Sequence, residues 1–208
     1  MCITSRSKKI KAFKYLENDN LSLVTRMIYE IIDTTPLDPL ARPLFESLQV
    51  EYSLRYHDFL TDSAASVAEE LTRYPTSAFA PPDGAFIVIV RDGETVGGGA
   101  LKRYDATTAE LKRIWTRADQ RRQGLASRIV QELEARAWQQ DYRRIYLTTG
   151  FRQPEAAGLY LKAGYEPLFD RSISPEVHFS LPFGKDLREP GRTDTLDDLR
   201  RPEPLGRP

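Results

Sequence analysis

The chain has 208 residues, of which 40% are hydrophobic and 29% are charged, an ordinary composition for one folded domain with a buried core. Its 30 basic residues equal its 30 acidic residues, so the overall charge gives no case for a nucleic-acid partner. Because the sequence has no bilayer-length apolar run, no signal-peptide core and no second cysteine beside Cys2, we expect a cytoplasmic protein without disulfides and without a membrane partner.

Composition divides the chain into three parts. Residues 1–20 are polar, and basic up to Lys14, and are predicted to form a mobile N-terminal segment. Residues 185–208 carry many charges and several prolines but few large apolar groups. They cannot offset their ordering entropy and are predicted to be a disordered tail. The folded domain is therefore expected over residues 21–184.

The first half of this domain is predicted to contain one strand and two helices. β-Branched and apolar residues favour a strand over residues 25–35. Asp38-Pro39 combines an N-cap residue with proline at the first helical position, and apolar residues at helical spacing then extend a helix to about His57. A second helix is expected over residues 62–73, followed by a proline-rich loop over 74–84.

The centre is predicted to be an antiparallel meander of strands over residues 85–90, 96–102 and 109–116. Asp92-Gly93 has the sequence of a tight turn between the first two strands. The second strand contains Gly97-Gly98-Gly99, which offers no side chains to pack. This run predicts either a bulge or a close approach of the backbone.

The segment after the meander has the most informative pattern in the chain. Apolar residues recur every four positions from Leu125 and predict a helix to about Gln140. A short basic, glycine-containing loop joins the preceding strand to this helix. At such a junction, unpaired backbone N–H groups and the positive end of the helix dipole suit a pyrophosphate. The candidate ligand-binding residues are Arg121, Arg122, Gln123, Gly124, Leu125, Ala126 and Ser127.

The remaining pattern predicts a strand over residues 144–149, a short helix over 154–163 and strands over 165–169 and 177–181. Together, the elements indicate an α/β domain with a mostly antiparallel, mixed sheet of six or seven strands and helices on both faces.

Residues 109–167 resemble the GCN5-related N-acetyltransferase (GNAT) superfamily, in its bacterial small-molecule branch. The acyl-CoA loop of that family reads Gln/Arg-x-x-Gly-x-Gly/Ala, and its later helix reads Asn-x-x-Ala-x-x-Leu-Tyr-x-x-x-Gly-Tyr/Phe. Gln153 stands where the later motif usually has asparagine. The matching residues are Arg121, Gly124 and Ala126 in the loop, and Ala156, Leu159, Tyr160, Gly164 and Tyr165 in the helix motif. The two motifs occur at the expected separation, one at a strand–loop–helix junction and the other at a helix–strand junction. Together they are much more specific for this family than either motif alone.

The resemblance implies direct acetyl transfer from acetyl-CoA to an amine, without a covalent enzyme intermediate and without a metal. It also implies that strand 111–116 splays from strand 144–149. Backbone N–H groups near Ile114 and Thr116 would then pair with the pantetheine and the thioester oxygen, and Gln153 would contact the pantetheine. Preorganised donors of this kind stabilise a developing oxyanion.

Two side chains are candidates for proton transfer. Glu110 could accept the proton of the ammonium, directly or through water, but it could equally be a carboxylate paired with Lys112 or a cross-strand cation. Tyr160 is the candidate acid for the thiolate, with a core tyrosine as the alternative. Proton transfer from a phenol near pKa 10 to a thiolate near 8.5 is uphill by roughly 2 kcal/mol. Tyr160 could therefore act only as a hydrogen-bond donor to the sulfur.

The expected acceptor is the primary amine of a small molecule. Two alternatives stay open, namely a protein or peptide N-acetyltransferase and a non-catalytic acyl-CoA-binding module. Homodimers are frequent in the resembling family, and the sequence does not select one. The acceptor is expected to contact the hairpin at residues 170–176 and a group of residues in the first helix, namely Glu51, Tyr52, Tyr56, His57 and Asp58.

Overall fold

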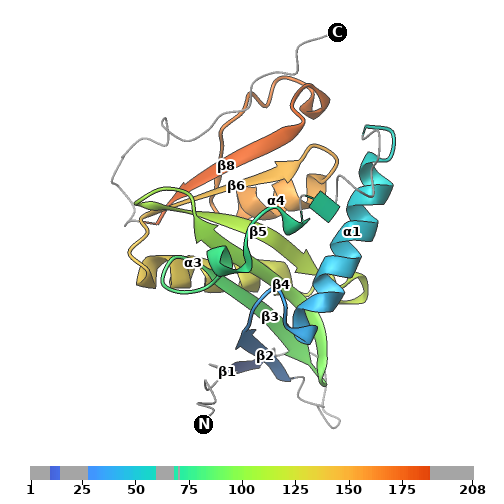
Figure 1. Cartoon of the computed structure of the whole chain (residues 1–208). Helices are drawn as coiled ribbons and strands as arrows, with labels where there is room; N and C mark the ends of the chain where they lie inside the picture. Colours follow the sequence, from blue (N-terminus) through green and yellow to red (C-terminus); the bar gives the residue numbers. More distant parts are fainter. Residues whose placement is uncertain (1–9, 15–27, 60–67, 70, 188–208) are drawn as a thin grey trace, which may run out of the picture.

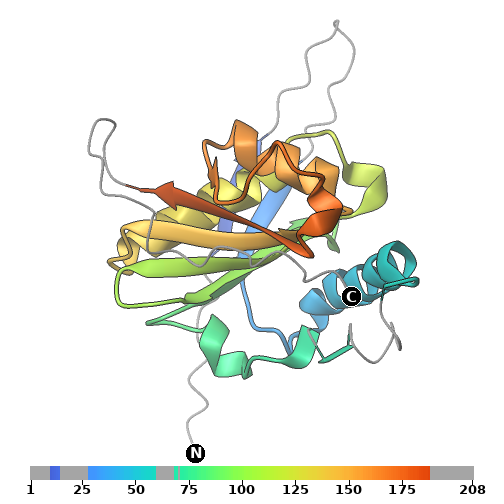
Figure 2. The same ribbon diagram turned by 90° about the horizontal axis from the view of Figure 1, so that it is seen from above.

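The structure is a computed structural model that describes residues 10–14, 28–59, 68–69 and 71–187. It contains one twisted sheet with helices packed on both faces (Figure 1). Edge-on, α1 lies on one side of the sheet and α3 and α4 lie on the other (Figure 2). The predicted fold class, α/β with a mostly antiparallel mixed sheet, is confirmed.

The described residues form eight strands in the spatial order β1-β2-β3-β4-β5-β6-β8-β7. All neighbouring pairs are antiparallel except β5 and β6, which are parallel. The bounds are β1 (Ile10–Lys14), β2 (Ile28–Asp33), β3 (Ala85–Arg91), β4 (Glu94–Arg103), β5 (Thr108–Thr116), β6 (Arg144–Gly150), β7 (Glu166–Pro167) and β8 (Ser180–Asp186).

Three α-helices have bounds given by the described residues: α1 (Arg42–Tyr56), α3 (Leu125–Gln139) and α4 (Pro154–Lys162). Short 3-10 turns occur at η1 (Pro39–Ala41), η2 (Thr76–Phe79), η3 (Ala118–Gln120) and η4 (Pro175–Val177). The predicted cap is present, because Asp38 Oδ1 accepts the Leu40 N–H at 3.0 Å. Ala68, Glu69, Leu71 and Thr72 are helical, while much of the helix expected at 62–73 lies outside the described residues.

Each face of the sheet has its own core. On one face, Leu44 and Leu48 of α1 pack with Phe86 and Val88. On the other, the intervening Ile87 and Ile89 belong to the cluster that contains α3 and α4 residues. Because β3 is buried on both faces, its sequence reads as a continuous apolar run rather than an alternating one.

Both features predicted for the three central glycines, a bulge and a close approach of the backbone, are present. The β4–β5 register shifts between Gly98 and Ala100, which marks a bulge. A Cβ on Gly99 would also lie 2.7 Å from Ile114 Cδ1 and 2.9 Å from Ile129 Cγ2, so α3 approaches the sheet closely there. At the predicted hairpin, Asp92 and Gly93 both have positive φ, 52° and 82°. These values are those of a tight two-residue turn.

Several predicted boundaries were wrong. Residues 10–14, expected in the mobile N-terminal segment, form β1 and pair with β2, which is why the sheet exceeds seven strands. The strand predicted at 177–181 starts only at Ser180, because the segment before it turns as η4, with the Val177 N–H donating to the Ser174 carbonyl at 3.0 Å. Likewise, the strand predicted at 165–169 is limited to Glu166–Pro167.

The expected tail boundary at residue 185 was also too early. Lys185 and Asp186 pair with Ile145 and Arg144 of β6, and the Leu187 N–H donates to the Arg143 carbonyl at 2.8 Å. Residues 25–27 of the first predicted strand lie outside the described residues. Among the described helices, none is both long and apolar enough to cross a membrane.

Candidate functional site

The parallel strands β5 and β6 pair along only part of their length. Pairing runs from Thr108 with Arg144 to Leu111 with Leu147 and then stops. β5 continues to Thr116 beside β4, and β6 continues to Gly150 beside β8. We call this unpaired region, residues 112–116 of β5 and 148–150 of β6, the split. Its position agrees with the splay that the family resemblance implies.

A bulge in β5 accompanies the split. Ala100 pairs with Lys112 and Gly98 pairs with Trp115, so Gly99 alone opposes both Arg113 and Ile114. Arg113 has φ 59°, in the left-handed region that non-glycine residues rarely adopt. A bulge bends the strand that carries the extra residue and increases its twist. The bend therefore carries β5 away from β6 just beyond the last paired residue.

The backbone of β5 presents donors to the split. The Arg117 N–H donates to the Val96 carbonyl at 2.9 Å and therefore points toward β4. Because N–H groups alternate between the two edges of a strand, those of Thr116 and Ile114 point toward the split. The Thr116 hydroxyl is also buried, and within the described part of the chain it has no hydrogen-bond partner. The N–H groups of Thr116 and Ile114 can bind the carbonyl and amide oxygens of an extended ligand.

The loop before α3 has the backbone shape of an anion site. Arg122 and Gly124 have positive φ, 63° and 77°, and Gly124 is the N-cap of α3. The Arg128 N–H donates to the Gly124 carbonyl at 3.0 Å. Over the described residues, no protein acceptor is found for the N–H groups from Arg122 to Ser127. Such a row of donors at a helix N-terminus suits a diphosphate.

Several side chains of this loop hold it in place. Arg121 donates from Nη2 to Glu51 Oε2 at 2.8 Å, and from Nε to the Thr116 carbonyl at 3.4 Å. Gln123 Oε1 accepts the Tyr29 hydroxyl at 3.0 Å. The Leu125 side chain is buried in the core, so only its N–H faces the loop. Arg122 and Ser127 are exposed, and Ala126 is half-buried.

Gln153 lies at the turn between β6 and α4. Its Oε1 accepts both the Thr149 hydroxyl and the Gly150 N–H, each at 3.1 Å. This oxygen therefore closes the turn at the end of the split. Of the Gln153 amide, only Nε2 then remains for the expected contact with pantetheine.

Tyr160 of α4 is brought to the same part of the sheet. Its ring is 5.7 Å from both the Tyr165 and the Phe183 rings, and its side chain is buried. Burial, and to a lesser extent the neighbouring Tyr52 of α1, raises the pKa of Tyr160 above its ordinary value. Within the described residues, the Tyr160 hydroxyl makes no hydrogen bond to the protein. Tyr160 is thus a core residue whose hydroxyl lies near α1.

Glu110 is buried in two ion pairs, 2.7 Å from Lys102 Nζ and 2.9 Å from Lys112 Nζ. Both ammonium groups also lie over the Tyr74 ring, at 4.5 and 5.5 Å from its centroid. The structure thus shows the ion-paired arrangement that the sequence left open. Proton acceptance by Glu110 would neutralise the carboxylate that both lysines share and so weaken both pairs. Glu110 lies on the opposite sheet face from Tyr160, because the adjacent Leu111 packs in the Tyr160 cluster.

Sequence reasoning missed how α1 is tied to the β6–α4 turn. Glu51 pairs with Arg55 at 2.9 Å, and Arg55 also pairs with Glu155 of α4. Arg152 pairs with Asp58. The only local signal was the i,i+4 spacing of Glu51 and Arg55. Glu51 and Asp58, which were expected to bind the acceptor, are therefore engaged by arginines, whereas His57 is exposed and bonds the Leu54 carbonyl at 3.0 Å.

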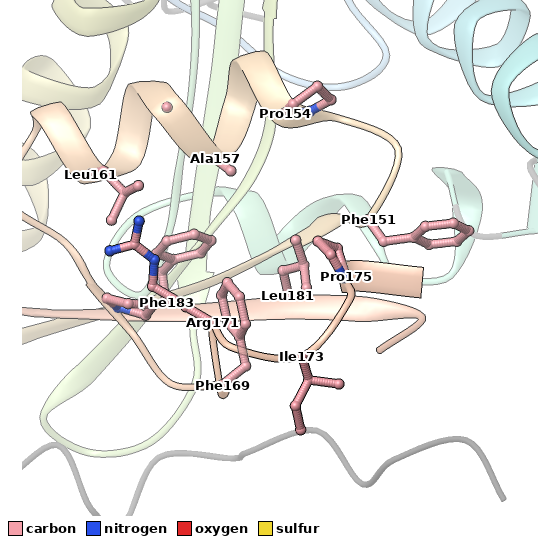
Figure 3. Close-up of a pocket in the computed structure, with 12 residues that line it drawn as sticks. Phe151, Pro154, Ala157, Leu161, Phe169, Arg171, Ile173, Pro175, Leu181 and Phe183 are labelled. Atoms are coloured by element: carbon pink, nitrogen blue, oxygen red, sulfur yellow. The ribbon is translucent and has the colours of Figure 1, made fainter. Parts of the chain in front are cut away.

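A separate apolar groove of about 290 Å³ lies along the outer side of α4. Figure 3 shows α4 residues on one side and β8 residues on the other, with Arg171 reaching toward Leu161. The groove includes Phe183, whose ring also contacts Tyr160, but Tyr160 does not line it. No group of three or more His, Cys, Asp or Glu side chains that could hold a metal ion occurs in the described part of the chain.

Comparison with known proteins gives a consistent result. The sequence model of the acetyltransferase (GNAT) family matches residues 43–165. The chain is 26% identical over 132 residues to the uncharacterized N-acetyltransferase YjgM of Escherichia coli (strain K12), covering 62% of this chain and 76% of that protein.

Solved structures show the same architecture. One is a Klebsiella pneumoniae protein named for acyl-CoA N-acyltransferase activity, with TM-score 0.57 and 26% identity over 77% of this chain and 98% of that one. Another is the PaiA N-acetyltransferase of Thermoplasma acidophilum in complex with coenzyme A, with TM-score 0.60 and 16% identity over 76% of this chain and 98% of that one. At 16% identity the second similarity concerns the fold alone.

Proposed function

The chain belongs to the acetyltransferase (GNAT) family, and we propose that it moves an acetyl group from acetyl-CoA to the primary amine of a small molecule. N-acetyltransferase activity follows from the family, whereas the acyl donor and the acceptor are our proposals. The observation that carries them is the combination of the split with a row of N–H donors at the start of α3.

The proposed donor fits the groups along this path. The N–H groups from Arg122 to Ala126 would bind the diphosphate, with Arg121 and Arg122 adding positive charge. The N–H groups of Thr116 and Ile114 would then bind the pantetheine and the thioester oxygen. Aromatic rings packed around Tyr160 favour a short acyl group over a long one.

In this proposal the protein contributes to transfer in two ways. The backbone donors of β5 would stabilise the negative charge that develops on the thioester oxygen as the amine attacks, an effect worth about 3 kcal/mol per donor. Tyr160 would donate a hydrogen bond to the departing sulfur. The proton lost by the amine would pass to water or to Glu110, and in the latter case both lysine pairs of Glu110 would be weakened.

A small acceptor is favoured by the position of α1. The ion pairs from α1 to Arg121 and Glu155, and from Asp58 just beyond α1 to Arg152, hold the C-terminal half of α1 beside the split and work against an extended peptide groove. The ion-paired state of Glu110 is the observation that favours the alternative of a non-catalytic acyl-CoA-binding module. A cytoplasmic location and a homodimer stay predictions.

The test is a thiol-release assay with acetyl-CoA across amines, amino acids, aminoglycosides and peptides. We expect turnover with a small amine and loss of acetyl-CoA binding in Gly124→Glu, because a carboxylate at the diphosphate site overlaps and repels it. Turnover with peptides alone would show that the acceptor is a peptide and not a small amine. Binding without turnover on any acceptor would favour the non-catalytic module.

A further inference from the structure

Arg113 marks the point where the side-chain alternation of β5 inverts. Before the bulge, Leu111 packs in the cluster on the α3 side of the sheet. After it, Trp115, also an odd-numbered position, packs in the cluster on the α1 side and donates from Nε1 to Ser47 Oγ at 2.8 Å. A regular strand would keep both residues on one face, so the extra residue has changed the parity.

The same inversion decides which N–H groups reach the split. The Tyr104 N–H donates to the Thr108 carbonyl, which places the even-numbered N–H groups of β5 toward β4 before the bulge. Beyond it, the Arg117 N–H donates to Val96, so odd-numbered groups face β4 there. Without the bulge, Ile114 and Thr116 would use their N–H groups within the sheet, and the expected thioester donors would be lost.

The Arg113 side chain fastens this bulge to three other segments. Its Nη2 donates to the Leu71 carbonyl at 2.6 Å. Its guanidinium lies 4.5 Å from the centroid of the Phe79 ring and 5.1 Å from that of Phe45. Phe79 is fully buried in η2, and Phe45 belongs to α1. A planar cation between two rings, with a carbonyl acceptor, is held in one orientation.

Building on the proposed acetyl transfer, we propose that Arg113 is a positioning residue for the transfer step. It fixes the bulge that turns the Ile114 and Thr116 N–H groups into the split, and its side chain holds that backbone conformation against Leu71, Phe45 and Phe79. Arg113 itself need not touch the thioester, because it acts through the backbone that follows it.

The test distinguishes positioning of the thioester carbonyl from binding of the coenzyme. Asparagine tolerates the left-handed backbone but cannot span to Leu71, so Arg113→Asn should lower kcat about 30-fold, as expected when donors shift by a fraction of an ångström. The Kd for coenzyme A, which keeps the pantetheine but has no thioester carbonyl, should rise by no more than about fivefold, clearly less than the loss of kcat. Arg113→Lys retains the cation and should recover part of kcat.

A spectroscopic readout follows the donors directly. Hydrogen bonds from Ile114 and Thr116 would lower the infrared carbonyl stretch of bound acetyl-CoA in the native protein. In Arg113→Asn this stretch should move back toward its value in water. Asp141→Gly is the matched control, because it removes the side chain of another residue with positive φ, 66°, in an exposed turn far from the split, and it should leave both kcat and the stretch unchanged.

A folded Arg113→Asn protein with native kcat, or with kcat and coenzyme A affinity lowered in parallel, would overturn the proposal. If that variant does not fold, Phe45→Leu tests the proposal instead. It removes one of the two rings that contact the Arg113 guanidinium, and Phe45 is only half-buried. A several-fold loss of kcat with unchanged affinity supports the assignment, and native kcat overturns it. Native protein that binds no coenzyme A would instead remove the proposed function.

Discussion

Tyr160 shows how burial limits the chemistry open to a single side chain. A phenol with a raised pKa is a weaker acid, so full proton transfer to a thiolate is less favourable for Tyr160 than for an exposed tyrosine. A hydrogen bond to sulfur needs no such transfer. The Tyr160 hydroxyl, which makes no hydrogen bond to the described protein, therefore fits a donor that stabilises the leaving group and leaves its protonation to solvent.

Tyr160→Phe should lower kcat by roughly tenfold, the worth of about one hydrogen bond, with little change in acetyl-CoA affinity. Because burial raises the pKa of Tyr160, the hydroxyl keeps its proton throughout the range below pH 10, and it should cause no alkaline loss of rate there. Steady-state rates from pH 6 to 9.5 check both points. An alkaline limb that vanishes in the variant would instead make Tyr160 a titrating acid.

Tyr165→Phe is the matched control for this prediction. Its ring lies beside that of Tyr160, but its hydroxyl donates to Glu134 Oε1 at 2.9 Å. The variant should lower stability by about 1 kcal/mol through loss of that bond and leave kcat unchanged.

Glu110→Gln tests whether this carboxylate is structural or catalytic. Two lysines pair with Glu110, and all three side chains are mostly buried. Removal of the anion should lower the free energy of unfolding by about 3 kcal/mol, because two cations stay without their shared partner. Urea unfolding measures this loss. A stable variant whose rate loses its acidic limb would restore Glu110 as the general base.

At the level of elements, α1 is attached to the opposite side of the split by side chains rather than by backbone pairing. Arg152 donates to Asp58 at the helix end, and Tyr56 accepts the Arg152 N–H at 3.3 Å. Such contacts depend on charge, so the attachment of α1 should weaken in acid.

Arg152 lowers the pKa of Asp58 from 3.8 to about 2. A depressed carboxyl pKa adds stability that is present above the ordinary value and lost as pH falls through the folded value. The stability difference between native protein and Asp58→Asn should therefore shrink as pH drops from about 4 to about 2. Denaturant unfolding at several pH values measures it. Since Asp58 is exposed, the difference should also shrink in high salt, and a salt-independent difference would contradict the ion-pair account.

Local sequence pattern predicted the elements that depend on nearby residues. α3 was correct because Leu125, Ile129 and Leu133 repeat on one face. β1 was missed because its place in the sheet depends on pairing with β2, a partner that composition does not reveal. The glycine run correctly predicted a bulge, but the extra residue proved to be Arg113 on the partner strand, because only the register shows which strand carries it.

At the scale of the whole molecule, one parallel pair in an otherwise antiparallel sheet creates the candidate site. Because β5 and β6 run in the same direction, the loop before α3 and the turn before α4 follow strand ends at the same edge of the sheet (Figure 1). The sequence predicted both junctions from their motifs. The split between the strands came only from the family resemblance, since no local pattern encodes where pairing stops.

Contacts between segments far apart in the sequence also determine where the folded domain ends. Lys185 Nζ contacts Glu134 Oε1 at 2.9 Å and the Ala163 carbonyl at 2.8 Å, so the end of β8 ties α3 to the end of α4. Deletion of 185–208 would leave Glu134 without its cation and remove the outer pairs with β6. This should cost about 2 kcal/mol and lower the melting temperature by about 5 °C.

Deletion of 188–208 alone retains all of these contacts and should leave the melting temperature unchanged. Thermal unfolding of the two truncated proteins beside the full chain makes the comparison. Deletion of 185–208 should lower the melting temperature more than deletion of 188–208. Lys185→Met in the full chain should reproduce the part of this drop that comes from the ion pair with Glu134. Equal melting temperatures for the two truncations would mean that residues 185–187 add nothing, and a large drop on removing 188–208 would mean that the acidic and basic tail itself packs on the domain.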